Sequence, residues 1–323
     1  MKSGTLFTLV TAALAVLVTA SALVARHYAK PGPLAEDKTI TIPAGTSVTG
    51  IASLLEKEGI IQNPTAFKLA AQLTGLAPTL KAGEYTFPAH ISLRSTLNKL
   101  ALGRTAMRSL TLPEGYTTRQ IMALMASEES GLKGNAPIPE EGSVFPDTYK
   151  YTAGTGRHNL LKSMQSRMND ELMAAWQGRD TTIPLRTPAE LLNLASIVQK
   201  EAANEEEMPM IAAVFQNRLK KGMKLQADPT VIYGMESPSG TDVINIRRSD
   251  LSEPHPFNTY VYIGLPPTPI SNPGRAALLA TANPAQTDAL FFMANPSRTG
   301  HTFATTYADH KKNVQTYWQN QPK

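Results

Sequence analysis

The sequence contains no cysteine among its 323 residues. The chain therefore forms no disulfide bond, and it offers no thiolate for a zinc site, an iron–sulfur cluster or nucleophilic catalysis. Because proteins without cysteine occur in reducing and oxidising compartments alike, this absence leaves the compartment open.

Several other signatures are missing as well. The six histidines are scattered, without the HExxH spacing of many zinc hydrolases, and no GxxxxGK[ST] phosphate-binding loop or GxSxG nucleophile turn occurs. The net charge is only +5, and no basic block is interleaved with aromatic residues as in nucleic-acid-binding proteins. We therefore expect no metal ion, no cofactor and no nucleic-acid partner.

The remaining composition is that of a globular protein, with 42% hydrophobic and 18% charged residues. These proportions exclude a wholly disordered or collagen-like chain. A chain of this length is typical of about two domains, each with its own hydrophobic core.

One long apolar run is present, at the N-terminus. Residues 3–25, between Lys2 and Arg26, carry no charge, and about 20 apolar residues suffice to cross a bilayer. A cleaved signal peptide is the alternative, since Ala20-Ser21-Ala22 resembles a cleavage site, but the apolar run continues beyond it. We favour an uncleaved anchor within residues 1–30, with a cytoplasmic N-terminus and an exported body, because no second spanning run follows.

A small module follows the apolar run. Pro31-Gly32-Pro33 breaks the helix, which indicates a linker at residues 31–38. The next segments alternate as in a strand, then repeat as in a helix, and the sequence predicts a β-α-α-β module within residues 39–105. The predicted elements are residues 39–42, 48–55, 64–73 and 83–87.

The start of this module recurs 70 residues later in the chain. Residues 110–112, the turn Pro113-Glu114-Gly115 and Thr117 repeat the pattern of residues 40–42, the turn after them and Ser47. A second strand–turn–helix unit is therefore predicted at the beginning of a larger domain, residues 106–323.

One predicted helix begins with clear signals. Thr187 is a favourable N-cap, Pro188 suits the first helical position, and Glu190 lies at the third position of a capping box. The apolar stripe of this helix comprises Leu191, Leu194, Ala195 and Val198.

Glu201 lies three residues after Val198 and four after Ile197, so it continues the apolar stripe. Burial and the negative end of the helix dipole both disfavour a charged carboxylate there, so we expect a raised pKa. A carboxylic acid that stays protonated near neutral pH suits a general acid. The alternative is that Glu201 emerges at the helix end and is solvated, as is expected for residues 205–207.

Ser130-Gly131-Leu132-Lys133 matches the SxxK motif of penicillin-recognising serine enzymes. That motif requires a helix, which Gly131 and Gly134 disfavour, and no SxN motif follows. We therefore interpret this match as chance.

Motifs on both sides of Glu201 point to a family. The main ones are Ile197-Val198-x-x-Glu201, Leu225-Gln226-x-Asp228-Pro229-Thr230, Asn258-Thr259-Tyr260, Asn272-Pro273-Gly274 and Gly300-His301-Thr302-Phe303. Together, and from roughly residue 110 to the C-terminus, they closely resemble the YceG-like family of endolytic murein transglycosylases.

The resemblance implies an α+β fold with an N-terminal transmembrane helix, a small LysM-like β-α-α-β module and a larger mixed α+β catalytic domain. It also implies a single-pass protein of the bacterial inner (cytoplasmic) membrane, with a periplasmic or otherwise extracytoplasmic body. The family is associated with terminating nascent strands beside peptidoglycan synthases, so penicillin-binding proteins are candidate partners.

The resemblance further implies a reaction. The family cleaves the β-1,4 bond between MurNAc and GlcNAc within peptidoglycan glycan strands, without water, when the muramic C6 hydroxyl attacks its own C1 and leaves a 1,6-anhydro end. Ordinary glycosidases need two carboxylates. With an internal nucleophile one group suffices, and Glu201 occupies the matched position, as general acid and then base.

Six further polar residues in matched motifs are candidates for binding the substrate: Glu141, Gln226, Asp228, Tyr233, Asn258 and His301. Glu141 is the favoured second acid, placed to stabilise the oxocarbenium-like state. A structural role is equally expected for each, since Asp228-Pro229-Thr230 fits a turn. For the whole chain, the alternative is a non-catalytic, membrane-anchored glycan-binding scaffold that would not depend on Glu201.

Overall fold

The structure is a computed structural model that describes residues 28–43, 45–103, 106–152, 154–235, 245–297 and 299–319. The predicted membrane anchor, residues 3–25, lies outside the described residues. Within the part of the chain that is described, no helix is both long enough and apolar enough to cross a membrane. The chain divides into two compact units, Met1–Arg108 with Lys150–Gly154, and Ser109–Tyr149 with Thr155–Lys323.

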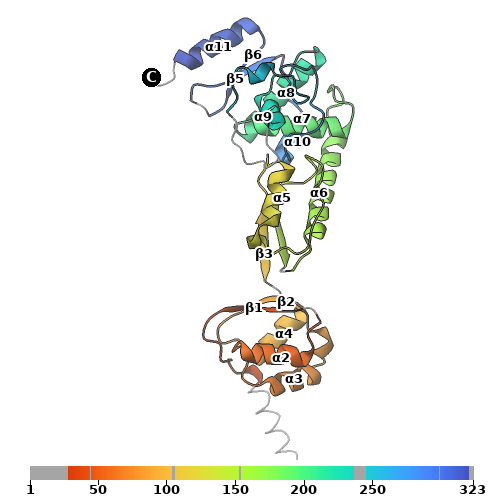
Figure 1. Ribbon diagram of the computed structural model, residues 1–323, viewed down its shortest axis with the longest axis vertical. Coiled ribbons are helices and arrows are strands. Elements are labelled where there is room, and N and C mark those ends of the chain that lie inside the picture. The colour runs from red at the N-terminus through yellow and green to blue at the C-terminus, as the bar shows by residue number, and fades with distance from the viewer. Residues whose placement is uncertain are drawn as a thin grey trace, which may run out of the picture. The chain divides into compact units, whose positions relative to one another are not determined.

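Among its described residues, the N-terminal unit contains the antiparallel sheet β1–β2 and the helices α2, α3 and α4 (Figure 1). Strand β1 pairs with β2 so that Ile40 lies opposite Tyr85. Alternate residues of β1 face the core, with Ile42 only 1% exposed. The elements in order are β1 (Lys38–Ile42), α2 (Val48–Lys57), α3 (Pro64–Leu73), the short 3₁₀ helix η1 (Ala77–Thr79), β2 (Gly83–Phe87) and α4 (Leu93–Leu102).

The predicted strand–helix–helix–strand order is thereby confirmed, and local capping explains where its helices begin. The side chain of Ser47 accepts a hydrogen bond from the Gly50 amide at the start of α2. Asn63 does the same for Ala66 at the start of α3. Each cap supplies an acceptor to an amide that the first helical turn leaves unpaired.

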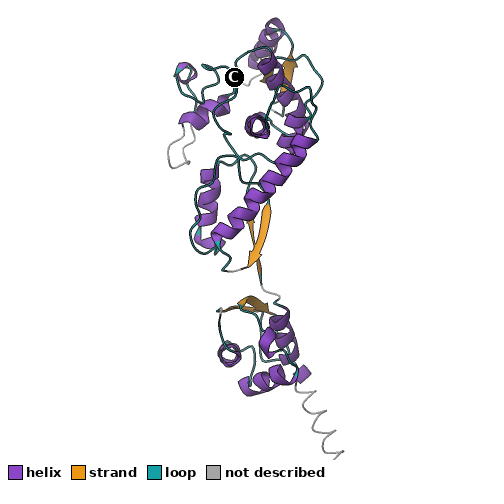
Figure 2. Cartoon of the chain, turned by 90° about the vertical axis from the view of Figure 1, so that its right-hand side faces the viewer, coloured by secondary structure: helices purple, strands orange, loops and turns teal. Residues whose placement is uncertain are grey.

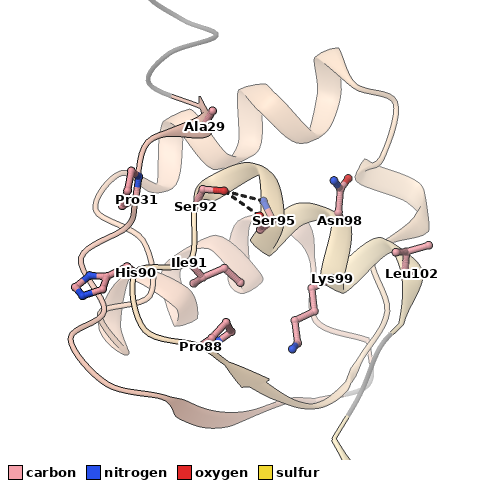
Figure 3. Close-up of a pocket in the computed structure, with 10 residues that line it drawn as sticks. All are labelled: Ala29, Pro31, Pro88, His90, Ile91, Ser92, Ser95, Asn98, Lys99 and Leu102. Carbon is pink, nitrogen blue, oxygen red and sulfur yellow. Dashed lines mark hydrogen bonds between the residues drawn. The ribbon is translucent and has the colours of Figure 1, made fainter.

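A cavity of about 600 Å³ lies along α4 in this unit (Figure 3). Figure 3 shows Ser92 at the start of the helix, hydrogen-bonded to Ser95 one turn later, with Asn98 and Lys99 farther along. Polar and apolar side chains both line the cavity, and they come from α4, from the loop before it and from Ala29 and Pro31.

A second two-stranded sheet pairs β3 (Met107–Thr111) with β4 (Thr148–Thr152). After β3, Thr117 and Gln120 form a complete capping box at the start of α5 (Thr118–Ala126). A short 3₁₀ helix, η2 (Glu128–Ser130), follows. The predicted second strand–turn–helix unit is thus confirmed.

Helices form the core of the C-terminal unit, and its strands are short (Figure 2). Helices α7 and α8 pack against each other and against α10, and α6 packs on α7 and α10. The largest buried cluster gathers apolar side chains of these helices, including Leu194, Ile211 and Phe215. The helices are α6 (Arg157–Gln177), α7 (Pro188–Glu201), α8 (Met208–Lys220) and α10 (Arg275–Ala282).

The remaining elements surround that helical core. They are η3 (Glu205–Glu207), α9 (Asp228–Met235), η4 (Asp250–Ser252), the antiparallel pair β5 (Phe291–Ala294) and β6 (His301–Ala304), and α11 (Tyr307–Gln319). The described residues thus form small two-stranded sheets with many helices, which confirms the predicted mixed α+β class.

Candidate active site

Helix α7 begins where its sequence signals predict. The Thr187 hydroxyl accepts a hydrogen bond from the Glu190 amide at 3.1 Å, and Pro188 occupies the first turn. The Glu190 carboxylate, however, accepts from the Arg186 amide at 2.6 Å, one residue before the predicted partner. The two side chains still pair one backbone amide within the first turn and one just before it, so the start of the helix is well determined.

Glu201 is the last residue of α7, and its side chain is half-buried. Burial, assisted by the negative charge of Asp228 and opposed by the charge of Arg218, raises the pKa of Glu201 to about 8. Among the described residues, no group is hydrogen-bonded to this carboxyl. At neutral pH the carboxyl therefore holds a proton that is free to be donated, as the sequence predicts for a general acid.

The positive charge of Arg218 acts on Glu201, but the guanidinium of Arg218 is hydrogen-bonded to backbone carbonyls. Its guanidinium donates to the carbonyl of Leu290 at 2.7 Å and to that of Leu225 at 2.5 Å. The side chain is 7% exposed, and its burial lowers the pKa of Arg218. Arg218 thus joins α8 to the segment before β5 and to the loop before α9, and it acts on Glu201 through its charge.

Asp228 and Tyr260 form a hydrogen-bonded pair beside this charge cluster. The Tyr260 hydroxyl donates to the Asp228 carboxylate at 2.5 Å, and burial followed by this bond raises the pKa of Tyr260. Asp228 is exposed at the first position of α9, and its charge in turn raises the pKa of Glu201. Tyr260 was not among the predicted site residues, although it ends the Asn258-Thr259-Tyr260 motif that could have indicated it.

The loop that precedes Asp228 has a special backbone conformation. Gln226 adopts a φ of 52°, the left-handed region that costs a non-glycine residue about 1–2 kcal/mol. Thr259 compensates by accepting the Gln226 amide at 3.1 Å through its carbonyl and the Ala227 amide at 3.0 Å through its hydroxyl. The Gln226 side chain is exposed beside Asp228, where a ligand can reach it.

Asn258 is buried, at 1% exposed, and its amide serves the backbone around it. Its nitrogen donates to the carbonyls of Asp250 and Glu253, and its oxygen accepts from the Tyr260 amide at 2.9 Å. Through these contacts Asn258 stabilises the turn that positions Tyr260.

Glu141 lies in a second cluster of polar groups. One carboxylate oxygen accepts from the Thr118 amide at 2.8 Å and the Asn272 side chain at 3.2 Å, and the other accepts from the Tyr233 hydroxyl at 3.2 Å. Burial raises the pKa of Glu141, and these hydrogen bonds, mainly that from Thr118, oppose the rise. The carboxylate is therefore held rigidly as a hydrogen-bond acceptor.

Asn272, which begins the Asn272-Pro273-Gly274 motif, contacts several members of this cluster. It is 0% exposed, its nitrogen donates to Glu141, and its oxygen accepts the Val144 amide at 2.8 Å. Two residues later, Gly274 packs so closely on the Glu114 carboxylate that a Cβ there would require the Glu114 side chain to move.

The Glu141 cluster opens into a cavity of about 440 Å³. Tyr233 and Phe257 line it with their rings 4.9 Å apart, and His255 packs on Phe257 with the two ring centres 5.8 Å apart. Apolar ring faces together with a carboxylate and a hydroxyl suit a neutral ligand that carries many hydroxyl groups.

Helix α9 carries residues of both clusters. Asp228 is its first residue and Tyr233 follows five positions later, about 7.5 Å along a helix axis. The structure therefore brings Asp228 to Glu201, and Tyr233 to Glu141, on one short helix.

His301 belongs to a third group, at the start of β6. Its Nδ1 lies 2.9 Å from the Glu207 carboxylate, whose other oxygen accepts the His301 amide, and its ring packs edge-on against Phe292. A Cβ on Gly300 would meet the same carboxylate at 2.3 Å. Glu207, which was expected to be solvated, instead anchors the β5–β6 turn.

Groups of three or more acidic or histidine side chains that could hold a metal ion do not occur among the described residues.

Comparison with known proteins gives matches over most of the chain. The YceG-like family matches residues 40–316. A Bacillus subtilis (strain 168) protein named endolytic murein transglycosylase is 30% identical over 311 residues, which cover 86% of this chain and 84% of that protein. A protein of the same name from Streptococcus pneumoniae serotype 2 is 28% identical over 325 residues, covering 85% of this chain and 57% of that longer protein.

One solved structure is similar as well. The crystal structure of a yceG-like protein from Listeria monocytogenes aligns with a TM-score of 0.51 at 29% identity, and the match covers 86% of this chain and 99% of that one.

Proposed function

This chain belongs to the YceG-like family, and from that premise we propose that it is an endolytic lytic transglycosylase that cuts the glycan strands of peptidoglycan. The bond cleaved is the β-1,4 linkage between MurNAc and GlcNAc, and the product ends in 1,6-anhydroMurNAc. The relatives named endolytic murein transglycosylase support this assignment.

The observation that carries the proposal is the half-buried Glu201 carboxyl with its pKa near 8. In the proposed reaction, protonated Glu201 gives its proton to the glycosidic oxygen as the bond from C1 to that oxygen breaks. The resulting carboxylate accepts the proton of the muramic C6 hydroxyl while that oxygen bonds to C1. Glu201 therefore ends protonated, as it began, and no water is consumed.

Holding the C6 hydroxyl near C1 supplies an advantage of proximity, because the nucleophile and the electrophile belong to the same sugar. The cavity beside Glu141 is the proposed binding place for a neighbouring sugar. Tyr233 and Phe257 would pack on ring faces, and Glu141 would accept hydrogen bonds from hydroxyl groups while its charge supports the oxocarbenium-like state.

The remaining proposals concern place and partners. The apolar run at residues 3–25 supports a single-pass anchor in the bacterial inner membrane, with the body outside the cytoplasm. The β-α-α-β unit at residues 39–105 would act as a LysM-like glycan-binding module, and the cavity along α4, lined by polar and apolar side chains, supports that role (Figure 3). Cutting nascent strands would place the enzyme beside penicillin-binding synthases.

The chemistry of the products tests the proposed function. Purified full-length protein is incubated with isolated glycan strands in water enriched in ¹⁸O, and the products are analysed by mass spectrometry. We expect internal cuts that leave anhydro ends without the heavy isotope. Reducing ends labelled with ¹⁸O would indicate hydrolysis instead, and an absence of cleavage would favour the non-catalytic scaffold.

Replacing Asp228 by Asn tests the charge cluster around Glu201. Asn keeps an oxygen for the Tyr260 hydroxyl but removes the negative charge that raises the pKa of Glu201. The alkaline limb of the pH–rate profile is expected to move to lower pH by about 0.5 unit. Asp170 is exposed on α6, and Asp170→Asn makes the same change of charge there, so this variant should leave the profile in place. If the profile of Asp228→Asn did not move, the charge of Asp228 would not raise the pKa of Glu201.

A further inference from the structure

A second cavity of the C-terminal unit, about 990 Å³ and open to solvent, is not used by the mechanism above. Residues around the start of α7 and the end of α8 line it, together with the loop at residues 263–269. We call it the α7–α8 groove.

One buried polar atom of this groove has no partner. Asn193, on α7, is 7% exposed and lines the groove. Its nitrogen donates to the Pro266 carbonyl at 2.7 Å, which identifies the other atom of the amide as oxygen. That oxygen has no hydrogen-bond partner among the described residues, and a buried acceptor left unpaired costs about 1–3 kcal/mol. The oxygen itself is buried, so a ligand with an N–H or O–H group would complete it once the amide turns into the groove.

The charges at the groove favour an anion. Arg186 and Lys220 line it from opposite elements, both are exposed, and within the described residues neither forms an ion pair. The one acid that lines the groove, Glu190, already accepts the backbone amide of Arg186. The charge of Lys220 also acts on the Asp180 carboxylate, which does not line the groove. Arg186 and Lys220 together suit a free carboxylate.

The walls of the groove are aliphatic. Leu219, Leu265, Pro266 and Pro267 form them, and Ile263, although 65% exposed, belongs to the same surface. None of the described residues that line the groove carries an aromatic ring, in contrast with the cavity at Glu141. These walls suit small aliphatic side chains better than sugar rings.

The groove and the Glu201 carboxyl are both built on helix α7. Asn193 precedes Glu201 by eight residues on the same helix, a separation of about 12 Å along the axis. A polymer bound at Glu201 can therefore place a short substituent in the groove.

We propose that the α7–α8 groove binds the stem peptide of the glycan strand, with a free carboxylate of the peptide at Arg186 and Lys220 and a peptide N–H donated to Asn193. This inference rests on the proposed function, because the peptide is the part of peptidoglycan that carries aliphatic side chains, amides and carboxylates. The groove then selects strands that still carry their peptides.

The test compares two substrates that differ only in the peptide. Uncrosslinked strands with intact peptides and the same strands stripped of peptide by an amidase are cut by the wild type and by the double variant Arg186→Gln/Lys220→Gln. For peptide-bearing strands, we expect the double variant to have a KM about tenfold higher than that of the wild type, with an unchanged kcat. For stripped strands, we expect the two proteins to have the same KM and kcat. A double variant Lys162→Gln/Lys221→Gln removes two exposed positive charges outside the groove and should change neither KM.

Two outcomes would overturn the proposal. An equal rise in KM for both substrates would show that the groove binds the glycan itself. An unchanged KM for both would leave the groove without a ligand.

A binding measurement separates this proposal from the proposed function. Calorimetry with the Glu201→Gln full-length chain and a synthetic stem pentapeptide, as free acid and as C-terminal amide, does not depend on cleavage. We expect the free acid to bind more tightly, and the groove double variant to lose this preference. If the free acid is preferred but the wild type cuts no strands, the peptide-binding groove stands and the proposed transglycosylase function fails. If the wild type cuts strands but no peptide binds, the function stands and the peptide-binding groove fails.

Discussion

Glu201→Gln is expected to lower kcat on peptidoglycan strands about a thousandfold while leaving the fold intact. The amide has the shape of the protonated carboxyl but cannot give up a proton, and general acid catalysis is worth about 10² to 10⁴ in rate. KM should change little, because Gln occupies the same space. Release of soluble fragments from isolated sacculi, followed over time with equal amounts of protein, measures the loss.

The matched control is Glu206→Gln, an exposed glutamate five residues later in the chain, which should keep full activity. If Glu201→Gln kept more than a tenth of the wild-type rate, Glu201 would not be the proton donor. Glu141 would then be the next carboxyl to replace, since burial raises its pKa as well.

The same substitution is expected to stabilise the protein, increasingly so as the pH rises. In the unfolded chain Glu201 ionises near its model value of 4.5, whereas in the folded chain its pKa is about 8. Between these values the unfolded state gains charge that the folded state resists, so the wild type loses stability as pH rises from 4.5 to about 8 and loses no more above it. Gln does not titrate and escapes this loss.

Thermal unfolding of both proteins from pH 5 to pH 9 measures this effect. The melting temperatures should nearly coincide at pH 5, and by pH 8 that of Glu201→Gln should lie at least about 5 °C higher. Glu206→Gln should track the wild type at every pH. A gap between wild type and Glu201→Gln that stays constant with pH would mean that Glu201 titrates normally in the folded protein. A catalytic group that destabilises its own fold is the expected cost of function.

Local signals made much of the fold predictable from sequence. The cap at Thr187, the capping box at Thr117 and the alternation through Ile40 and Ile42 each depend on residues within a few positions, and the structure has all three elements. The position of Glu201 followed from the same periodicity, because the helix places it one turn after Val198.

Contacts between distant segments could not be predicted in this way. The bond between Tyr260 and Asp228 joins residues 32 apart, and that between Asn272 and Glu141 joins residues 131 apart. No periodicity encodes such pairs, so sequence reasoning named Asp228 without Tyr260 and Glu141 without Asn272. The sequence analysis also expected Glu207 to be solvated. It missed the contact with His301, because that hydrogen-bond partner lies 94 residues away in the chain. The left-handed backbone of Gln226 depends on Thr259 for the same reason.

A direct titration of the Glu201 carboxyl tests the central claim. The ¹³C chemical shifts of the glutamate side chains are followed against pH in the full-length protein, and the Glu201 signal is assigned by its absence from Glu201→Gln. The account predicts a midpoint near pH 8. A midpoint near 4.5 would contradict it, because the carboxyl would then be charged at neutral pH and would have no proton to give.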